Sequence, residues 1–372
     1  MVNNIHKTKG KVLVGLSGGV DSAVAALLLK KQGYEVIAGF MKNFSFPVNS
    51  PFAKYCTWKE DWRSAVRVAA KLDIPFHTFD FQKQYNDLVI DYFFSEYKKG
   101  RTPNPDVMCN KLIKFDVFLE AAKKLGIDSI ATGHYVRKQE DKKTGKYKLL
   151  RGIDSSKDQS YFLWTLNQDQ IKYSLFPLGS YTKKQVREIA DRAGIPSAHR
   201  PDSQGICFVG EINIPQFVAS RLPEKTGKVI FRDKVIGEHK GIQFYTIGQR
   251  KGLDNPKLQK NLAKIYKNKD VPPLYILEIK ASNNQIIIEE ERSLYKDNMT
   301  VSNIHWIANN QPKNKDVLVQ IRYQHKAMPA KIKEKNKNEF DIEFSKPVRA
   351  ITSGQSAVFY QDDEMLGGGI IE

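Results

Sequence analysis

Two patterns of hydrophobic and polar residues divide the chain near residue 207. In the first part, short apolar runs of strand length alternate with longer segments whose apolar residues recur at helical spacing. The predicted strands are Lys11–Leu16, Glu35–Met41, Phe76–Phe81 and Ser129–Thr132, and the predicted helices are Val20–Gln32, Trp62–Leu72, Tyr85–Lys99 and Phe115–Leu125. Strands that alternate with helices predict an α/β fold, in which a parallel sheet carries helices on both faces.

Apolar spacing predicts two more helices before this division, Phe162–Leu175 and Lys183–Ala193. The pattern changes in the second part of the chain. Beyond Cys207, short β-type runs separated by turn residues predict two small β-rich, barrel-like domains. Asn255–Lys269, which is rich in Lys, Asn and Gln, is expected to be a loop between strands. We therefore expect three domains, with bounds 1–207, 208–283 and 284–372.

The composition adds positive charge to this picture. The chain has 372 residues and a formal net charge of +18 at pH 7, so an acidic partner is expected, with nucleic acid as the first candidate. Genomic base composition alone could also produce this excess of Lys. No apolar run approaches the roughly 20 residues that span a bilayer, and residues 1–6 do not form a secretory signal. We expect a cytoplasmic protein with no membrane partner and reduced cysteines.

A Gly/Ser turn between the first predicted strand and helix has the pattern of a phosphate-binding loop. The turn runs Ser17-Gly18-Gly19-Val20-Asp21-Ser22. Its glycines let the backbone approach phosphate oxygens, and the helix N-terminus favours negative charge. The serines add hydroxyl donors, and Asp21 is a candidate ligand for Mg²⁺ on the phosphates. No metal site formed by the protein alone is expected.

The spacing of this turn separates it from two common nucleotide loops. It lacks the lysine of the Walker loop, and its glycines do not match the dinucleotide fingerprint. It resembles the pyrophosphate loop of enzymes that split ATP into AMP and pyrophosphate to adenylate a substrate. Because related loops serve amide synthesis, base amination and thiolation, the turn by itself indicates only the use of ATP. The alternative is an ordinary Gly-rich turn between a strand and a helix.

Two of the three cysteines lie in polar segments that can carry chemistry. Two prolines shortly before Cys109 disfavour helix, so we expect a stiff loop that holds Asp106 three positions before the thiol. Lys111 and Lys114 follow, and nearby cations raise the thiolate fraction. Asp106 could act as a general acid or base. The alternative for Cys109 is an inert buried thiol.

Cys207 completes a plausible pair of reactive thiols. His199 and Arg200 precede it and supply positive charge, although a position in the core is equally open. Two such cysteines beside an adenylating loop suggest that ATP activates a carbonyl oxygen and that sulfur then displaces AMP. A cysteine persulfide is the usual sulfur carrier in the cytosol, and the second cysteine would resolve the intermediate through a transient disulfide.

Motifs along nearly the whole chain agree with one family. In the first half they are Gly15–Ser22, Phe40–Asn43, Arg101–Asp106, Cys109–Lys111, Ala131–Tyr135 and Lys157–Leu163. Further along they are Asp202–Phe208, Thr246–Leu253 and Gly354–Tyr360. In these motifs the chain resembles the bacterial tRNA-specific 2-thiouridylases, which thiolate the wobble uridine (position 34) of certain tRNAs. Only the first motif is shared with other pyrophosphate-loop enzymes.

The resemblance implies an adenine-nucleotide α-hydrolase-like sheet and a set of site residues. Those implied to bind ATP are Gly15, Leu16, Ser17, Gly18, Gly19, Val20, Asp21, Ser22, Met41 and Gly133. Those implied to meet the target uracil are Asn104, Pro105 and Asp106. Cys109 is implied to be the nucleophile or resolving thiol, and Cys207 to carry the persulfide. Those implied to contact tRNA are His134, Lys157, Asp158, Gln159, Arg322, Tyr323 and Gln355.

The expected reaction has two steps. With ATP and Mg²⁺ bound, uracil O2 attacks the α-phosphate and pyrophosphate leaves. The persulfide on Cys207 then delivers sulfur to C2 and AMP leaves, while Asp106 assists proton transfer and Cys109 resolves the linkage. The β-rich domains would grip the anticodon arm, where Arg322 suits a phosphate or base edge and Tyr323 suits a stacked base. A separate cysteine desulfurase or sulfur-relay protein would supply the persulfide.

Two other functions stay open on the sequence alone. A pyrophosphate-loop ligase with a nitrogen nucleophile would keep the loop but need neither cysteine. An RNA-binding or chaperone-like module would bind tRNA without turning over ATP. The segment between residues 43 and 55 holds none of the acidic residues that relatives often carry there, so a metal- or partner-binding role for it is not expected. We expect Cys56 to be structural.

Overall fold

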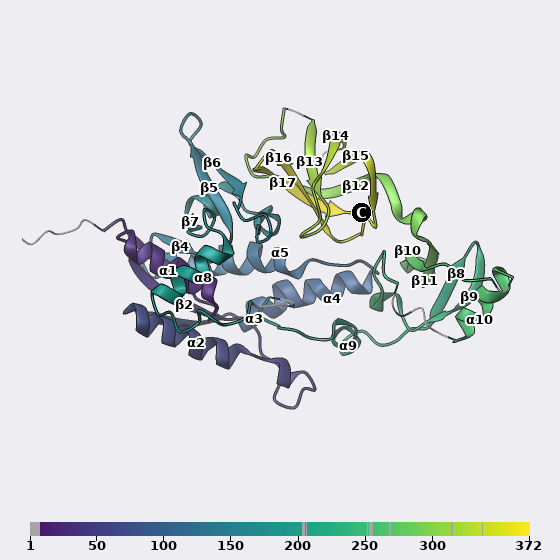
Figure 1. The fold of residues 1–372 in the computed structure, drawn as a ribbon, viewed down its shortest axis with the longest axis horizontal. Coiled ribbons are helices and arrows are strands. Elements are labelled where there is room, and N and C mark those ends of the chain that lie inside the picture. The colour runs from purple at the N-terminus through teal and green to yellow at the C-terminus, as the bar shows by residue number, and fades with distance from the viewer. Residues whose placement is uncertain are drawn as a thin grey trace, which may run out of the picture.

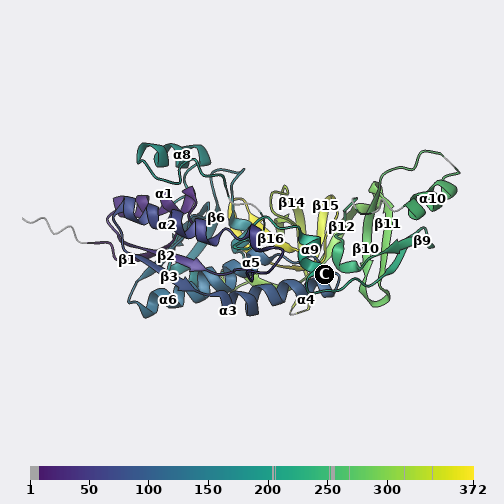
Figure 2. The same cartoon turned by 90° about the horizontal axis from the view of Figure 1, so that it is seen from below.

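The computed structural model describes residues 8–372 apart from 203, 204, 206, 251, 253–255, 268, 314 and 337. Parts of the motifs Asp202–Phe208 and Thr246–Leu253 therefore lie outside the described residues. Figure 1 shows an elongated molecule with an α/β part at one end, a barrel above the middle and a smaller sheet at the other end. From below, these parts follow one another along the long axis (Figure 2).

The α/β part is built on five parallel strands in the order β3-β2-β1-β4-β7. Their bounds are β1 Lys11–Gly15, β2 Glu35–Lys42, β3 Phe76–Asp80, β4 Ser129–Ala131 and β7 Ser174–Leu175. The central strand β1 is apolar because it is covered on both faces, and Val12, Leu13 and Val14 are fully buried. The carboxyl ends of β1 and β4 lead directly into the Gly/Ser turn and into Gly133, so the topology brings these segments together.

Helices cover both faces of this sheet, which confirms the predicted α/β class. One face packs against α1 (Val20–Lys31), α2 (Trp58–Leu72) and α8 (Lys183–Arg192). The other face packs against α3 (Gln82–Tyr85), α4 (Asp91–Lys98), α5 (Pro105–Cys109) and α6 (Phe118–Lys124). Two π-helical segments, Asn86–Ile90 and Asn110–Val117, join α3 to α4 and α5 to α6.

The prediction of a stiff loop before Cys109 is wrong, because this cysteine is the last residue of a helix. Helix α5 begins at Pro105, and the Asn104 side chain accepts a hydrogen bond from Val107 N at 3.3 Å. Proline suits the first helical position, where its fixed φ fits and its missing N–H has no helical partner to lose. The two prolines therefore mark the start of a helix, and Cys109 is held on regular backbone.

The single helix predicted over Phe162–Leu175 is also wrong. This stretch forms a short 3₁₀ turn at Ser160–Leu163, helix α7 at Gln168–Lys172 and strand β7. Asn167 makes a capping box with Gln170, which starts a separate helix. Local capping thus overrides the apolar spacing on which the prediction rested.

The loop predicted over Asn255–Lys269 is wrong for its described part, which contains helix α10 (Pro256–Ile265). Leu258 and Leu262 lie four positions apart, and both are buried against the neighbouring sheet. Two apolar residues on one helix face thus outweigh the polar composition of the segment. Helix α9 (Ile214–Ala219) lies earlier in the chain, with Asn213 as its cap.

The middle domain is a four-stranded sheet in the order β10-β11-β8-β9. Its strands are β8 Gly227–Phe231, β9 Lys234–His239, β10 Leu274–Lys280 and β11 Gln285–Glu290. The pair β11–β8 is parallel, and the other two pairs are antiparallel. Because β10 pairs with β11, residues 285–290 belong to this sheet.

The C-terminal domain is a closed barrel of six antiparallel strands, since β12 pairs with both β15 and β17. Its strands are β12 Tyr295–Trp306, β13 Asp316–Gln320, β14 Met328–Asn336, β15 Glu339–Arg349, β16 Ser356–Gln361 and β17 Glu364–Ile371. A hairpin from the α/β part, β5 (Val136–Asp141) and β6 (Lys146–Arg151), extends this sheet by pairing with β17. Two β-rich domains after an α/β domain confirm the predicted fold class.

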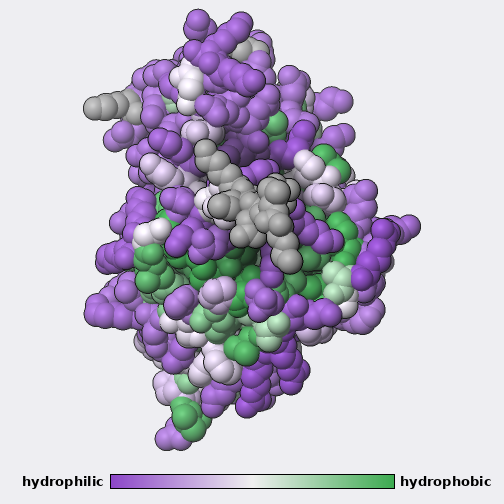
Figure 3. Space-filling model, turned by 90° about the vertical axis from the view of Figure 1, so that its left-hand side faces the viewer, coloured by the Kyte–Doolittle hydropathy of each residue, from purple (hydrophilic) through white to green (hydrophobic). Residues whose placement is uncertain are grey.

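Among the described residues, few large apolar side chains are exposed. Figure 3 shows the end of the molecule that carries the α/β part, where polar residues surround an apolar group across the middle of the face. The exposed large apolar residues are Val48, Trp62, Leu88, Leu125, Ile153, Val235 and Tyr295. No helix in the described part of the chain is long and apolar enough to cross a membrane.

Candidate active site

The Gly/Ser turn forms a compact loop at the N-terminus of α1. Gly18 has φ of +80°, which favours glycine. The Ser17 hydroxyl lies 3.2 Å from that of Ser22, which also accepts a hydrogen bond from Ser17 N at 3.1 Å. Among the residues that the structure describes, no side chain caps α1 at Gly19. Its first amide groups are therefore available to an anion, as a phosphate site requires.

Other residues implied to bind ATP lie against this loop. A Cβ atom on Gly133 would come within 2.8 Å of Ser22 N, and one on Gly15 within 3.1 Å of Met41 Cε. Leu16 N donates to Gly39 O at 2.9 Å, which ties the loop to β2. The fold thus brings the loop, Met41 and Gly133 together at one edge of the sheet.

Asp21 has close polar partners. Lys183 Nζ lies 2.7 and 2.8 Å from its two carboxylate oxygens, and the Tyr135 hydroxyl donates to it at 2.8 Å. The same ammonium lies 2.8 Å from Asp202, which also pairs with Lys157 at 2.8 Å. These cations hold the pKa of Asp202 at about 2 even though burial acts in the opposite direction. A partly buried ion-pair network therefore joins the loop to the segment that leads to Cys207.

The two predicted thiols lie together. Cys109 is fully buried and Cys207 half-buried, and their side chains share a hydrogen bond. Asp106 accepts a hydrogen bond from Cys207 N at 3.0 Å, and the Tyr85 hydroxyl donates to Cys207 O at 2.5 Å. Lys114 contacts the pair and hydrogen-bonds Cys207. Residues separated by about a hundred positions thus form one cluster of two thiols, a carboxyl and an ammonium.

The surroundings give the two thiols different acidities. Burial and the neighbouring Cys207 raise the pKa of Cys109 well above its ordinary value. The hydrogen bond from Cys109, together with Lys114, lowers the pKa of Cys207. Burial raises the pKa of Asp106. Burial alone would lower the pKa of Lys114, but the charges of the thiols and Asp106 raise it. Cys207 is therefore the better nucleophile, and Asp106 can exchange a proton nearer neutral pH.

The positive charge beside Cys207 does not come from the residues that the sequence suggested. His199 is 92% exposed at its side chain and lies 3.4 Å from Asp191. Arg200 donates to Gly18 O at 3.2 Å and pairs with Asp61. Arg200 thus makes a second link between the loop and the Cys207 segment, while the charge on the thiol comes from Lys114.

The residues implied to contact tRNA are mostly engaged within the protein. Asp158 accepts four hydrogen bonds, from Arg151, Gly152 N and the amide and hydroxyl of Ser160. Gln159 accepts from Tyr135 N at 3.1 Å, and Gln355 donates to the backbone of Thr102 and Pro103 at 3.0 and 3.1 Å. These side chains organise the loops around the site.

The other three residues implied to contact tRNA are His134, Arg322 and Tyr323. His134 is buried beside Thr132, 2.8 Å away, and burial lowers its pKa, so the imidazole is neutral. Arg322 is exposed on the barrel, where it reaches Ala350 O at 3.2 Å. The ring of Tyr323 lies 4.5 Å from that of Phe162. Arg322 and Tyr323 thus lie where the barrel meets the α/β part, and their contact with tRNA stays a prediction.

Sequence reasoning missed Lys183, Tyr85 and Tyr135. One signal for Lys183 was available, because Lys183 and Lys184 begin a helix, where acidic residues are favoured. Within the described residues, no group of three or more His, Cys, Asp or Glu side chains could hold a metal ion. Asp21 alone suits a Mg²⁺ ion held mainly by phosphates.

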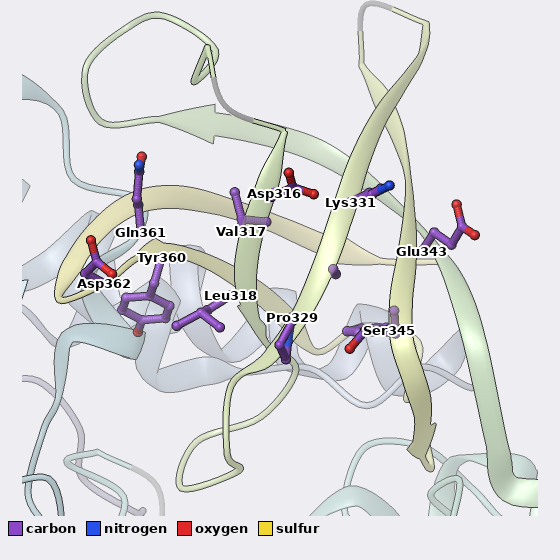
Figure 4. A pocket seen from close by; sticks show the side chains of 12 residues that line it. Asp316, Val317, Leu318, Pro329, Lys331, Glu343, Ser345, Tyr360, Gln361 and Asp362 are labelled. Carbon is purple, nitrogen blue, oxygen red and sulfur yellow. The ribbon is translucent and has the colours of Figure 1, made fainter.

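A separate groove lies away from this cluster. This groove, of about 650 Å³, crosses the outer face of β13, β14, β15 and β16 (Figure 4). Leu318, Pro329 and Tyr360 line its floor, and charged side chains such as Asp316 and Lys331 lie along it. It includes neither the loop nor the cysteines, so it is not the candidate active site.

Comparison with known proteins gives matches over the whole length of the chain. Three family models match: a tRNA methyl transferase HUP domain over residues 10–211, a tRNA methyl transferase PRC-barrel domain over 215–290 and an aminomethyltransferase beta-barrel domain over 296–371. The tRNA-specific 2-thiouridylase MnmA of Idiomarina loihiensis is 44% identical over 97% of this chain and 96% of its own. The protein of the same name from Proteus mirabilis is 44% identical over 97% of both chains.

Similarity to solved structures is weaker. A 4-thiouridine synthetase in complex with RNA and bound ATP is 19% identical, with a TM-score of 0.36 over 57% of this chain and 50% of that one. This similarity is too weak to assign a function. The assignment therefore depends on the curated relatives and on the geometry above.

Proposed function

The chain belongs to the tRNA-specific 2-thiouridylase family, a tRNA-uridine 2-sulfurtransferase family, and we propose that it thiolates the wobble uridine of tRNA through an adenylated uracil and a cysteine persulfide. One observation gives the main support for this mechanism. A half-buried thiol with a lowered pKa, Cys207, shares a hydrogen bond with a buried thiol, Cys109, beside the Asp106 carboxyl. Two such thiols suit a sulfur donor and its resolving partner.

The first step uses the Gly/Ser loop. ATP binds with its phosphates at the N-terminus of α1, between Gly15, Met41 and Gly133. Mg²⁺, when bound, neutralises phosphate charge, and Asp21 is the carboxylate that would hold it. Uracil O2 attacks the α-phosphorus, the bond to the bridging oxygen breaks, and pyrophosphate leaves with that electron pair. The product is a uracil whose O2 carries AMP.

The second step uses the two thiols. The terminal sulfur of a persulfide on Cys207 attacks C2 of the uracil, and AMP leaves with the C–O electron pair. Cys109 then attacks the Cys207 sulfur, so the S–S bond to the new thiocarbonyl sulfur breaks and a Cys109–Cys207 disulfide forms. A thiol reductant returns both cysteines to thiols. Asp106, with its raised pKa, accepts and returns the proton that Cys109 loses.

Each active-site group suits the role proposed for it. Cys207 is the more accessible and more acidic thiol, as a residue that takes sulfur from a separate donor protein should be. Cys109, held at the end of α5 and fully buried, is protected from other partners until the linkage must be resolved. The net charge of +18 favours tRNA as the acidic substrate. The location proposed for this reaction is the cytoplasm.

A comparison of two cysteine variants tests the proposal. Cys207→Ala should abolish 2-thiouridine formation on substrate tRNA in a reaction supplied with a cysteine desulfurase and cysteine, while ATP and tRNA still bind. Cys56→Ala, which removes the third thiol, should keep activity within about twofold, the scale of an ordinary surface substitution. Normal 2-thiouridine formation by Cys207→Ala would contradict the persulfide role. Release of ADP in place of AMP would contradict the loop assignment.

A further inference from the structure

The phosphate loop has no cation of its own. Residues 15–22 contain neither Lys nor Arg, whereas a triphosphate carries about four negative charges, and a helix N-terminus offers only about half a positive charge. Phosphoryl-transfer sites usually add Lys or Arg where charge builds up on the leaving group. A cation from elsewhere in the fold is therefore expected beside this loop. The inference that follows rests on the proposed use of ATP.

Lys183 lies where such a cation is needed. Its ammonium is 2.7 Å from the carboxylate of Asp21, the second residue of α1, and its side chain is only 12% exposed. Helix α8 packs against α1 through Val186 and Ala190, which fixes the base of the lysine over the helix N-terminus. The four-carbon side chain then allows the ammonium to turn from Asp21 to phosphates on the loop.

The position of Lys183 in α8 is unfavourable for the helix. It is the first residue after the cap Thr182, it is followed by Lys184, and the first turn contains no acidic residue in the described structure. A cation there opposes the helix dipole by about 0.3–1 kcal/mol. Natural sequences usually break such local rules at functional sites. The ammonium of Lys183 points instead into the ion-pair network with Asp21 and Asp202.

Lys183 belongs to a network of opposite charges. Asp21 and Asp202 pair with Lys183, Lys157 and Arg187, and Asp154 accepts a hydrogen bond from Lys183 N at 2.9 Å and interacts with Lys157. The three carboxylates and three cations balance in formal charge, so a phosphate group would compete with the carboxylates for the ammonium of Lys183. Because this ammonium is shielded from most of the water, it interacts with phosphate more strongly than it would on an open surface.

We propose that Lys183 binds the β- or γ-phosphate of ATP and neutralises pyrophosphate as it leaves. It supplies from α8 the cation that a Walker loop carries in its own sequence. The electron pair of the breaking bond passes to the pyrophosphate oxygen, the ammonium pairs with that oxygen or its neighbours, and no proton needs to move. The same movement would free Asp21 to hold Mg²⁺.

The test compares three variants in AMP formation with substrate tRNA. Lys183→Gln removes the charge and should lower kcat by on the order of 10²-fold, the usual cost of one charge-stabilising group. Lys183→Arg keeps the charge and should stay within about tenfold of the unmodified protein. Lys184→Gln is the matched control, because Lys184 is exposed on the same helical turn, and it should change kcat by less than about twofold.

Product inhibition separates binding of pyrophosphate from a structural role. Lys183→Gln should raise the Ki of pyrophosphate about tenfold or more and leave the Ki of AMP nearly unchanged, because only pyrophosphate contacts the ammonium. A loop that is merely disordered would weaken both. If Lys183→Gln does not fold, the pyrophosphate Ki of Lys183→Arg tests the proposal instead. Because this variant keeps the charge, a rise of more than about tenfold in its Ki for pyrophosphate overturns the proposal.

The controls keep this inference separate from the proposed function. An unmodified protein that releases AMP, together with equal effects of Lys183→Gln and Lys184→Gln, overturns the role of Lys183 alone. Parallel changes in both Ki values do the same. An unmodified protein that releases ADP overturns the adenylation mechanism and the role of Lys183 with it.

Discussion

The packing of Gly133 against α1 makes a quantitative prediction for Gly133→Ala. The added Cβ would lie 2.8 Å from Ser22 N and 2.9 Å from the carbonyl carbon of Asp21, whereas ordinary contacts begin near 3.4 Å. Both neighbours are backbone atoms of the first turn of α1, so no side chain can rotate away. The turn after β4 or the start of the helix must move by about half an ångström.

The cost of this movement sets the size of the effect. Overpacking of this kind costs about 1–3 kcal/mol. If the displaced helix N-terminus loses half of that free energy in its contact with phosphate, ATP affinity falls roughly 2- to 12-fold. Isothermal titration calorimetry with ATP gives the affinity directly, and thermal unfolding gives the change in stability.

Gly237→Ala is the matched control for this experiment. A Cβ on Gly237 would lie 3.2 Å from the side chain of Leu258 in the middle domain, far along the chain from the loop. It should lower stability slightly and leave ATP affinity unchanged. Equal ATP affinities for Gly133→Ala and Gly237→Ala would refute the reasoning, because the loop would then not depend on the close approach of Gly133.

Three further predictions follow from the charges in the structure. Lys114→Met should raise the pKa of Cys207 and slow its alkylation by iodoacetamide at neutral pH. Lys111→Met, at an exposed position, should leave the alkylation rate unchanged. Equal alkylation rates for the two variants would contradict the contact between Lys114 and Cys207. Asp158→Ala should destabilise the protein by about 3–5 kcal/mol in urea unfolding, because it strips a largely buried carboxylate from Arg151; a loss below about 1 kcal/mol would contradict the network. Asp202 has a folded-state pKa of about 2, below its ordinary 3.8, so its contribution to stability is present above pH 3.8 and is lost as the pH falls towards 2. Asp202→Asn should therefore weaken the dependence of the unfolding free energy on pH between 3.8 and 2. An unchanged pH dependence in this range would contradict the ion pairs of Asp202.

The α/β domain was predictable because its signals are local. Strands such as Lys11–Gly15 are nearly continuous apolar runs, and helices such as α2 carry buried residues at helical spacing, so the hydrophobic pattern gives much of the sheet and its helices. The failures came where capping decided the outcome. Pro105 starts a helix instead of ending one, and Asn167 divides a predicted helix into separate elements.

The active-site cluster depends on contacts between distant parts of the chain. The sequence indicates that Cys109, Cys207 and Asp106 can carry chemistry and that Lys114 lies near Cys109, but it does not show which cation reaches Cys207. Lys114 does so, while Arg200, which is closer in sequence to Cys207, binds Asp61. Lys183 reaches Asp21 only because α8 packs on α1. These relations follow from tertiary packing, which single-sequence patterns do not contain.

The central claim is that Cys207 delivers sulfur to an adenylated uridine, and a single-turnover reaction tests it most directly. The protein would be loaded with isotopically labelled persulfide, freed of the sulfur donor, and mixed with ATP and unmodified tRNA. Nucleoside mass spectrometry would then follow the label while AMP is counted. The account predicts labelled 2-thiouridine at the wobble position with one AMP released for each. Thiolated uridine without label, or without AMP, would contradict it.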